Sequence, residues 1–120
     1  MEKAEIQRKI NTLNREINNL ETKRTSYRNM RDEIKDAIDE LEDAKDSAKK
    51  AYESLSKYYQ SDTSSEKESE LGTEYQNIKR IIEDLEDFKT AAGKKIISMN
   101  SSIDDKEDDI KRLKRELNKL

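Results

Sequence analysis

This sequence of 120 residues lacks several residue types that normally fix a small fold, and each absence excludes a class of structure or chemistry. There is no Cys and no His, which excludes a disulfide framework, thiol chemistry and zinc sites of the usual kind. There is also no Pro and no Trp, and Gly72 and Gly93 are the only glycines. A chain with so few helix-breaking residues favours long, uninterrupted helices.

The composition indicates narrow helices rather than a thick globular core. Charged residues make up 44% of the sequence and hydrophobic residues 31%, which is too little apolar matter for a wide interior. The length allows one domain at most. We therefore expect residues 1–120 to form a single domain built from long amphipathic helices.

Charge and hydropathy also exclude two kinds of partner. The net charge is −3 with both signs interspersed, so we expect no binding to nucleic acid. No apolar run approaches the length of a membrane span, so we expect no membrane insertion. The first residues lack the apolar region of a secretory signal. We expect a cytoplasmic protein, and the alternative is export by a route that needs no cleaved signal.

The spacing of apolar residues predicts two helices. Alternating steps of four and three give a first series from Ile6 to Tyr59, in which thirteen of sixteen positions are apolar. A second series runs from Leu71 to Leu120, with thirteen of fifteen positions apolar. The exceptions are all basic: Arg24, Arg31, Lys45, Lys89 and Lys106. Such a spacing is typical of the a and d positions of a coiled coil, here called the seam, in which Ile10 is an a position.

The polar stretch at residues 60–65 predicts a turn between the two series. Thr63 and Glu66 fit a capping box at the start of a helix, and a second candidate start follows Gly72. The turn therefore covers residues 60–65 or extends to residue 72.

A short turn makes two long helices antiparallel neighbours. The predicted fold is an all-α, antiparallel two-helix coiled-coil hairpin, with helices over residues 2–59 and 66–120. The second helix has three candidate break points, at Gly72, Gly93 and Asn100.

Pairing about this turn predicts partners for the basic seam residues. Arg24 is expected near Asp104 and Asp105. Lys106 is expected near Glu21. Cations at seam positions cost stability but discourage wrong registers. The alternative is that they extend their charges to water.

A third apolar row widens the seam in the half of the hairpin next to the turn. It occupies g positions, which lie on the same side of the seam in both helices of an antiparallel pair. The row consists of Met30, Ala37, Ala44, Ala51 and Tyr58 in the first helix and Ile81 and Phe88 in the second. A hairpin alone would leave this row in water, so we predict that it binds another helix. The partner is a foreign protein or a second copy, and the alternative is that the alanines serve helix propensity alone.

Charges are unevenly distributed, with eight acids and two lysines in residues 32–46. We interpret this run as a solvated face, because oppositely charged residues spaced four apart, such as Glu53 and Lys57, are common along the chain.

Catalytic motifs are absent. Adjacent carboxylates such as Asp104 and Asp105 lie on exposed helices without a cleft to shift their pKa values. There is no Gly-rich phosphate loop and no nucleophile paired with His. We therefore expect no enzyme activity, no metal and no cofactor.

A Pro-free helical hairpin of this length resembles the small helical partner proteins of LXG toxins in Gram-positive bacteria, which are similar to WXG100 proteins of type VII secretion. The features that carry the resemblance are the amphipathic helix from Ile6 to Leu20, the polar turn and the C-terminal segment from Lys94 to Leu117. The Trp-x-Gly turn of that family is absent, and Tyr58-Tyr59-Gln60-Ser61 stands in its place.

The resemblance implies an adaptor or targeting factor. Such a protein would bind the helical N-terminal domain of a toxin, together with a second small helical protein, and present it for type VII export. The alternative is a self-assembling coiled-coil scaffold or spacer. An adaptor alone should be monomeric or weakly dimeric, whereas a scaffold should assemble tightly by itself.

Overall fold

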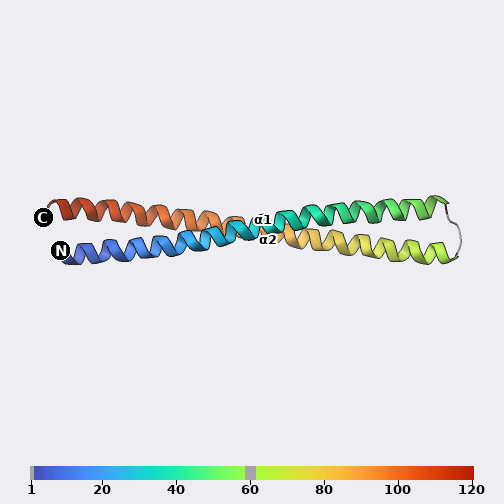
Figure 1. Cartoon of the computed structure of the whole chain (residues 1–120), viewed down its shortest axis with the longest axis horizontal. Helices are drawn as coiled ribbons and strands as arrows, with labels where there is room; N and C mark the ends of the chain where they lie inside the picture. Colours follow the sequence, from blue (N-terminus) through green and yellow to red (C-terminus); the bar gives the residue numbers. More distant parts are fainter. Residues whose placement is uncertain (1, 59–61) are drawn as a thin grey trace. The chain divides into compact units, whose positions relative to one another are not determined.

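The chain forms two long α-helices, as a computed structural model shows (Figure 1). The structure describes residues 2–58 and 62–120, and it describes no side chains between residues 55 and 71. Helix α1 spans Lys3–Tyr58 and helix α2 spans Asp62–Asn118. These described residues contain no strand, and the prediction of an all-α antiparallel helix pair is confirmed.

Helix α2 begins at Asp62, four residues before the predicted start at residue 66. The predicted turn at residues 60–65 includes residues 60 and 61, which lie outside the described residues. From residue 62 to residue 71 the sequence has no Gly or Pro to prevent a helix. The helix then continues through Gly72, Gly93 and Asn100 without a break.

The chain divides into two units, each made of one stretch of α1 and one stretch of α2. Unit 1 contains residues 1–30 and 91–120, and unit 2 contains residues 31–90. Within each unit the two helices lie side by side and run in opposite directions (Figure 1).

Unit 1 has a continuous core of seam residues. Its buried cluster consists of Ile6, Ile10, Ile17, Ile103, Ile110 and Leu113, with Leu13, Leu20 and Leu117 packed against it. Ile6 is only 1% exposed, although the unit has just two helices. Branched and long aliphatic side chains at every third or fourth residue meet across the seam, which explains this burial.

Unit 2 has a thinner core. Among its described side chains Ile38 and Ile82 are buried, whereas the other seam residues of the unit are half-buried or exposed. The seam residue Tyr52 is 41% exposed. Lys45 bridges to Glu42 on its own helix, with 2.9 Å between Nζ and Oε2. Two helices alone therefore cover the apolar side chains of unit 2 less completely than those of unit 1.

The predicted partners of the basic seam residues in unit 1 are wrong by about one helical turn. Arg24 donates a hydrogen bond from Nη1 to Oδ1 of Asn100 at 2.8 Å, rather than meeting Asp104 or Asp105. The Nε atom of Arg24 is buried, and no hydrogen-bond partner for it occurs among the described residues.

Lys106 shows the same displacement. Its Nζ lies 2.9 Å from Oε2 of Glu16 rather than beside Glu21. The earlier start of α2 accounts for both differences, because a shorter connection pairs each residue of α1 with a lower-numbered residue of α2.

Candidate protein-binding face

The g positions of unit 2 form an exposed apolar row. We call Ala37, Ala44, Ala51, Ile81 and Phe88 the apolar stripe. Ile81 is 48% exposed and Phe88 is 65% exposed, while Ala44 and Ala51 are exposed and Ala37 is half-buried. Exposed large side chains at helical spacing are unusual on a protein surface that stays in water.

The two remaining predicted residues do not belong to the described part of this stripe. Met30 is 46% exposed and is the last α1 residue of unit 1, so it is placed in the other unit. The side chain of Tyr58 lies outside the described residues.

The helix pairing in unit 2 brings the two halves of the stripe to one side of the seam. A Cβ atom added at Gly72 would lie 4.0 Å from Cε2 of Tyr52, so Gly72 of α2 lies beside Tyr52 of α1. In this alignment Phe88 lies level with Ala37, and Ile81 lies level with Ala44. A large side chain thus projects from α2 beside a small one on α1, which leaves a step against which another side chain can pack.

The neighbouring residue Ile82 shows why the stripe is not part of the core. Ile82 occupies the seam and is 7% exposed, whereas Ile81 is 48% exposed. The two side chains differ by about 100° around the helix axis, since an α-helix has 3.6 residues per turn. Only the side chain of Ile82 points at α1.

Four carboxylates border the stripe, and we call them the acidic rim. They occupy g and c positions on the same side of the seam: Glu33, Glu40, Glu74 and Asp84. All four are exposed, and within the described part of the chain none of them forms an ion pair. Sequence reasoning treated the acids of residues 32–46 as a general solvated face. The c positions of Glu33 and Glu40 are the signal that could have placed these two acids beside the stripe.

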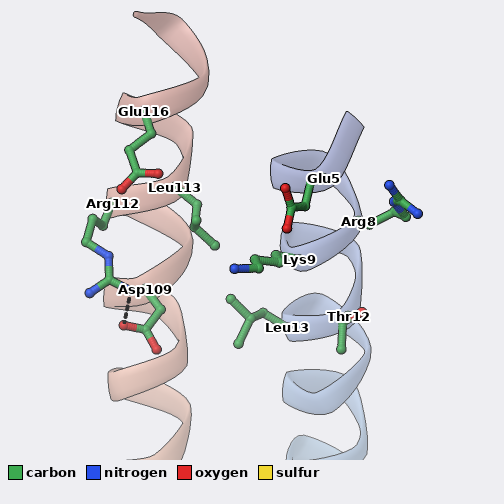
Figure 2. Close-up of a pocket in the computed structure, with 9 residues that line it drawn as sticks. All are labelled: Glu5, Arg8, Lys9, Thr12, Leu13, Asp109, Arg112, Leu113 and Glu116. Carbon is green, nitrogen blue, oxygen red and sulfur yellow. Dashed lines mark ion pairs between the residues drawn. The ribbon is translucent and has the colours of Figure 1, made fainter. Parts of the chain in front are cut away.

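The g and c positions of unit 1 have a different chemistry. An open groove of about 500 Å³ lies there, lined mainly by charged side chains around Leu13 and Leu113. Figure 2 shows Leu13, Leu113 and Lys9 pointing into the space between the helices, whereas Arg8 and Arg112 lie on the outer sides of their helices. Arg112 Nη2 pairs with Asp109 Oδ1 at 3.4 Å (Figure 2). The groove therefore offers charge rather than a continuous apolar row.

A second groove lies on the opposite side of unit 2, the side of the e positions. Its volume is about 360 Å³, and its lining includes Tyr52, Gly72 and Tyr75 with Lys49 and Glu53 at its edge. The ring of Tyr52 lies beside Gly72, where an added Cβ would be 4.0 Å from Cε2 of the ring, an ordinary van der Waals distance. This side thus carries aromatic surface together with both signs of charge.

Neither side presents a set of ligands for a metal ion. The described residues contain no group of three or more acidic side chains placed to hold one. The pKa of Lys45 is raised above its usual 10.5, chiefly by the hydrogen bond to Glu42. Over the described ranges, no helix is long and apolar enough to cross a membrane.

Comparison with known proteins identified one family. The family described as prefoldin subunit matches residues 4–96, a range that includes the whole apolar stripe. Searches of curated proteins and of solved structures gave no significant match. The comparisons do not link the chain to LXG toxin partners or to WXG100 proteins, the group that its sequence features resemble.

Proposed function

The chain belongs to the prefoldin subunit family of helical, non-enzymatic chaperone-type proteins, and from this premise we propose that it is a protein-binding adaptor. Its apolar stripe would hold an amphipathic helix of another protein against unit 2. The two helices of unit 2 and the bound helix would then share one core.

The exposure of Phe88 and Ile81 beside small alanines is the observation that carries this proposal. Completely burying a side chain of this size contributes about 1.5–3 kcal/mol. Because both side chains are already partly covered, their further burial would contribute roughly 2 kcal/mol together. The partly covered seam of unit 2 would gain additional shielding from the same helix.

We further propose the helical N-terminal domain of a secreted toxin as the partner, with the adaptor presenting it for type VII export. This narrower proposal draws support from the sequence resemblance alone. In it, the toxin domain and a second small helical protein would complete the bundle.

A designed helical peptide tests the adaptor proposal without knowledge of the natural partner. The peptide would have about 21 residues, or three heptads, with Leu and Ile on one face, Gln on its flanks and a single Trp. Since the protein has no Trp, the fluorescence of the peptide reports binding directly. We expect saturable binding that is lost, by about 100-fold or more, in the double variant Ala44→Asp with Phe88→Asp.

A matched control places the same two charges elsewhere. Ala4 and Ile97 are exposed in unit 1, and Ile97 is 69% exposed. The double variant Ala4→Asp with Ile97→Asp should bind the peptide as the unmodified protein does. Circular dichroism should show that both double variants keep their helicity. Equal binding by all three proteins would refute the stripe as the site.

A further inference from the structure

The acidic rim gives the apolar stripe an electrostatic preference. Its four carboxylates surround Ile81 and Phe88, and all of them are exposed. Among the residues of unit 2 whose side chains the structure describes, which are residues 31–54 and 72–90, no Lys or Arg occupies a g or c position. Over these two ranges, the negative charge on this side is therefore not compensated by a base on the same side.

The opposite side of unit 2 provides the contrast. Its e positions include Lys35, Lys49 and Lys79, interspersed with Glu42 and Glu86. Both signs of charge thus occur on the side without the stripe. Net charge alone does not produce the acidic rim, because the bases within residues 31–54 and 72–90 lie at other heptad positions.

A second copy of the chain is a poor occupant of the stripe. Placing two copies stripe to stripe would bring the acidic rim of one against that of the other, and like charges in close contact oppose association. The g and c positions of unit 1 in a second copy would offer neutralising bases such as Lys9 and Arg112, but they form no continuous apolar row to cover the stripe.

We propose that the stripe selects a foreign amphipathic helix whose apolar face is flanked by Lys or Arg, because such flanks would meet the acidic rim. This inference rests on the proposed adaptor function and specifies its partner class. The bound helix supplies aliphatic side chains to Ile81 and Phe88 and cations to the carboxylates on both sides. Electrostatic complementarity of this kind sets partner choice and speeds association.

Three peptides with one apolar face and different flanks test the preference. They have the design given above, with flanks of Lys, Gln or Glu. At about 0.05 M salt we expect the Lys peptide to bind most tightly and the Glu peptide most weakly, with at least a tenfold difference between them. At about 1 M salt the difference should fall to within about twofold, because the screening length shrinks to about 3 Å.

Neutralising the rim should abolish this order. The rim variant carries Glu33→Gln, Glu40→Gln, Glu74→Gln and Asp84→Asn. The control variant removes four exposed acids from the other side of the same unit: Asp39→Asn, Asp46→Asn, Glu53→Gln and Glu83→Gln. Both variants have the same net charge, but only the rim variant should bind the three peptides with similar affinity.

The outcomes separate this inference from the adaptor function. If the Gln peptide binds but the three affinities are equal, or the order survives in the rim variant, the preference for basic flanks is wrong and the adaptor function stands. If no peptide binds, the adaptor function itself fails.

Light scattering provides a further test of the same inference. We expect the unmodified protein at its monomer mass of 14.1 kDa. A tight dimer at low salt that dissociates on Phe88→Asp would show that a second copy occupies the stripe, and it would overturn the inference.

Discussion

The adjacent residues Ile81 and Ile82 allow the same substitution to be made in the stripe and in the seam. Ile82 is 7% exposed and Ile81 is 48% exposed. Replacing either with Ala removes the same atoms from the same helix, so differences in composition and helix propensity cancel. The comparison therefore isolates what each side chain contributes to folding.

The expected magnitudes follow from burial. Losing about three buried carbons costs roughly 2.4 kcal/mol in transfer free energy, and a cavity adds to it, so Ile82→Ala should cost about 2–4 kcal/mol. Ile81 is half exposed, so its transfer loss is about 1 kcal/mol, and the better helix propensity of Ala offsets a few tenths of the cost in both variants alike. The two variants should differ by at least about 1 kcal/mol, or roughly 4 °C in Tm.

Urea and thermal unfolding followed by circular dichroism measure this difference. Each variant should be examined over a range of protein concentrations. Binding of the Gln-flanked peptide should change in the opposite way, with Ile81→Ala weakening it more than Ile82→Ala. Equal losses of stability at low concentration would refute the assignment of Ile81 to an exposed face.

Three further predictions concern helix and seam. Gly93→Ala should raise the free energy of unfolding by about 0.5–1 kcal/mol in the same urea assay, because Gly93 lies inside α2 and Ala favours a helix more than Gly does. An added Cβ at Gly93 would have no atom within 4 Å. A loss of stability would show that this space is filled. Arg24→Leu should raise the free energy of unfolding by about 1 kcal/mol, because the substitution removes a buried unpaired Nε and leaves Asn100 able to reach water. A lower free energy of unfolding would instead show that Arg24 stabilises the fold. The pKa of Lys45 is raised by Glu42, so its contribution is complete below pH 10.5 and is lost as pH rises through the raised pKa. Lys45→Met should therefore flatten that part of the stability profile above pH 10.5, and an unchanged profile would contradict the pairing.

Much of the fold and the candidate face could be predicted from the sequence because both follow from the helical repeat. The spacing that begins at Ile6 marked the side chains that the structure buries, including Ile10, Ile103 and Ile110. The g positions likewise marked Ile81 and Phe88 as apolar residues off the seam, and both are exposed. That these residues bind a partner remains a proposal.

The acidic rim was missed for a specific reason. Its members come from two helices, with Glu33 and Glu40 on α1 and Glu74 and Asp84 on α2. Along the sequence the first two belong to a longer acidic run, in which they are not distinguished from acids on other faces. Only the pairing of the helices places these four along the stripe that contains Ile81 and Phe88.

By itself the sequence determined the helical state and which face of each helix is apolar, because both depend on residue type and on a local period. The tertiary structure decided how far one helix is shifted along the other. A seam with apolar residues every three or four positions is nearly unchanged by a shift of one turn, so hydrophobic burial alone does not select among such registers. The pairing of the two helices is what places Arg24 beside Asn100 and Lys106 beside Glu16.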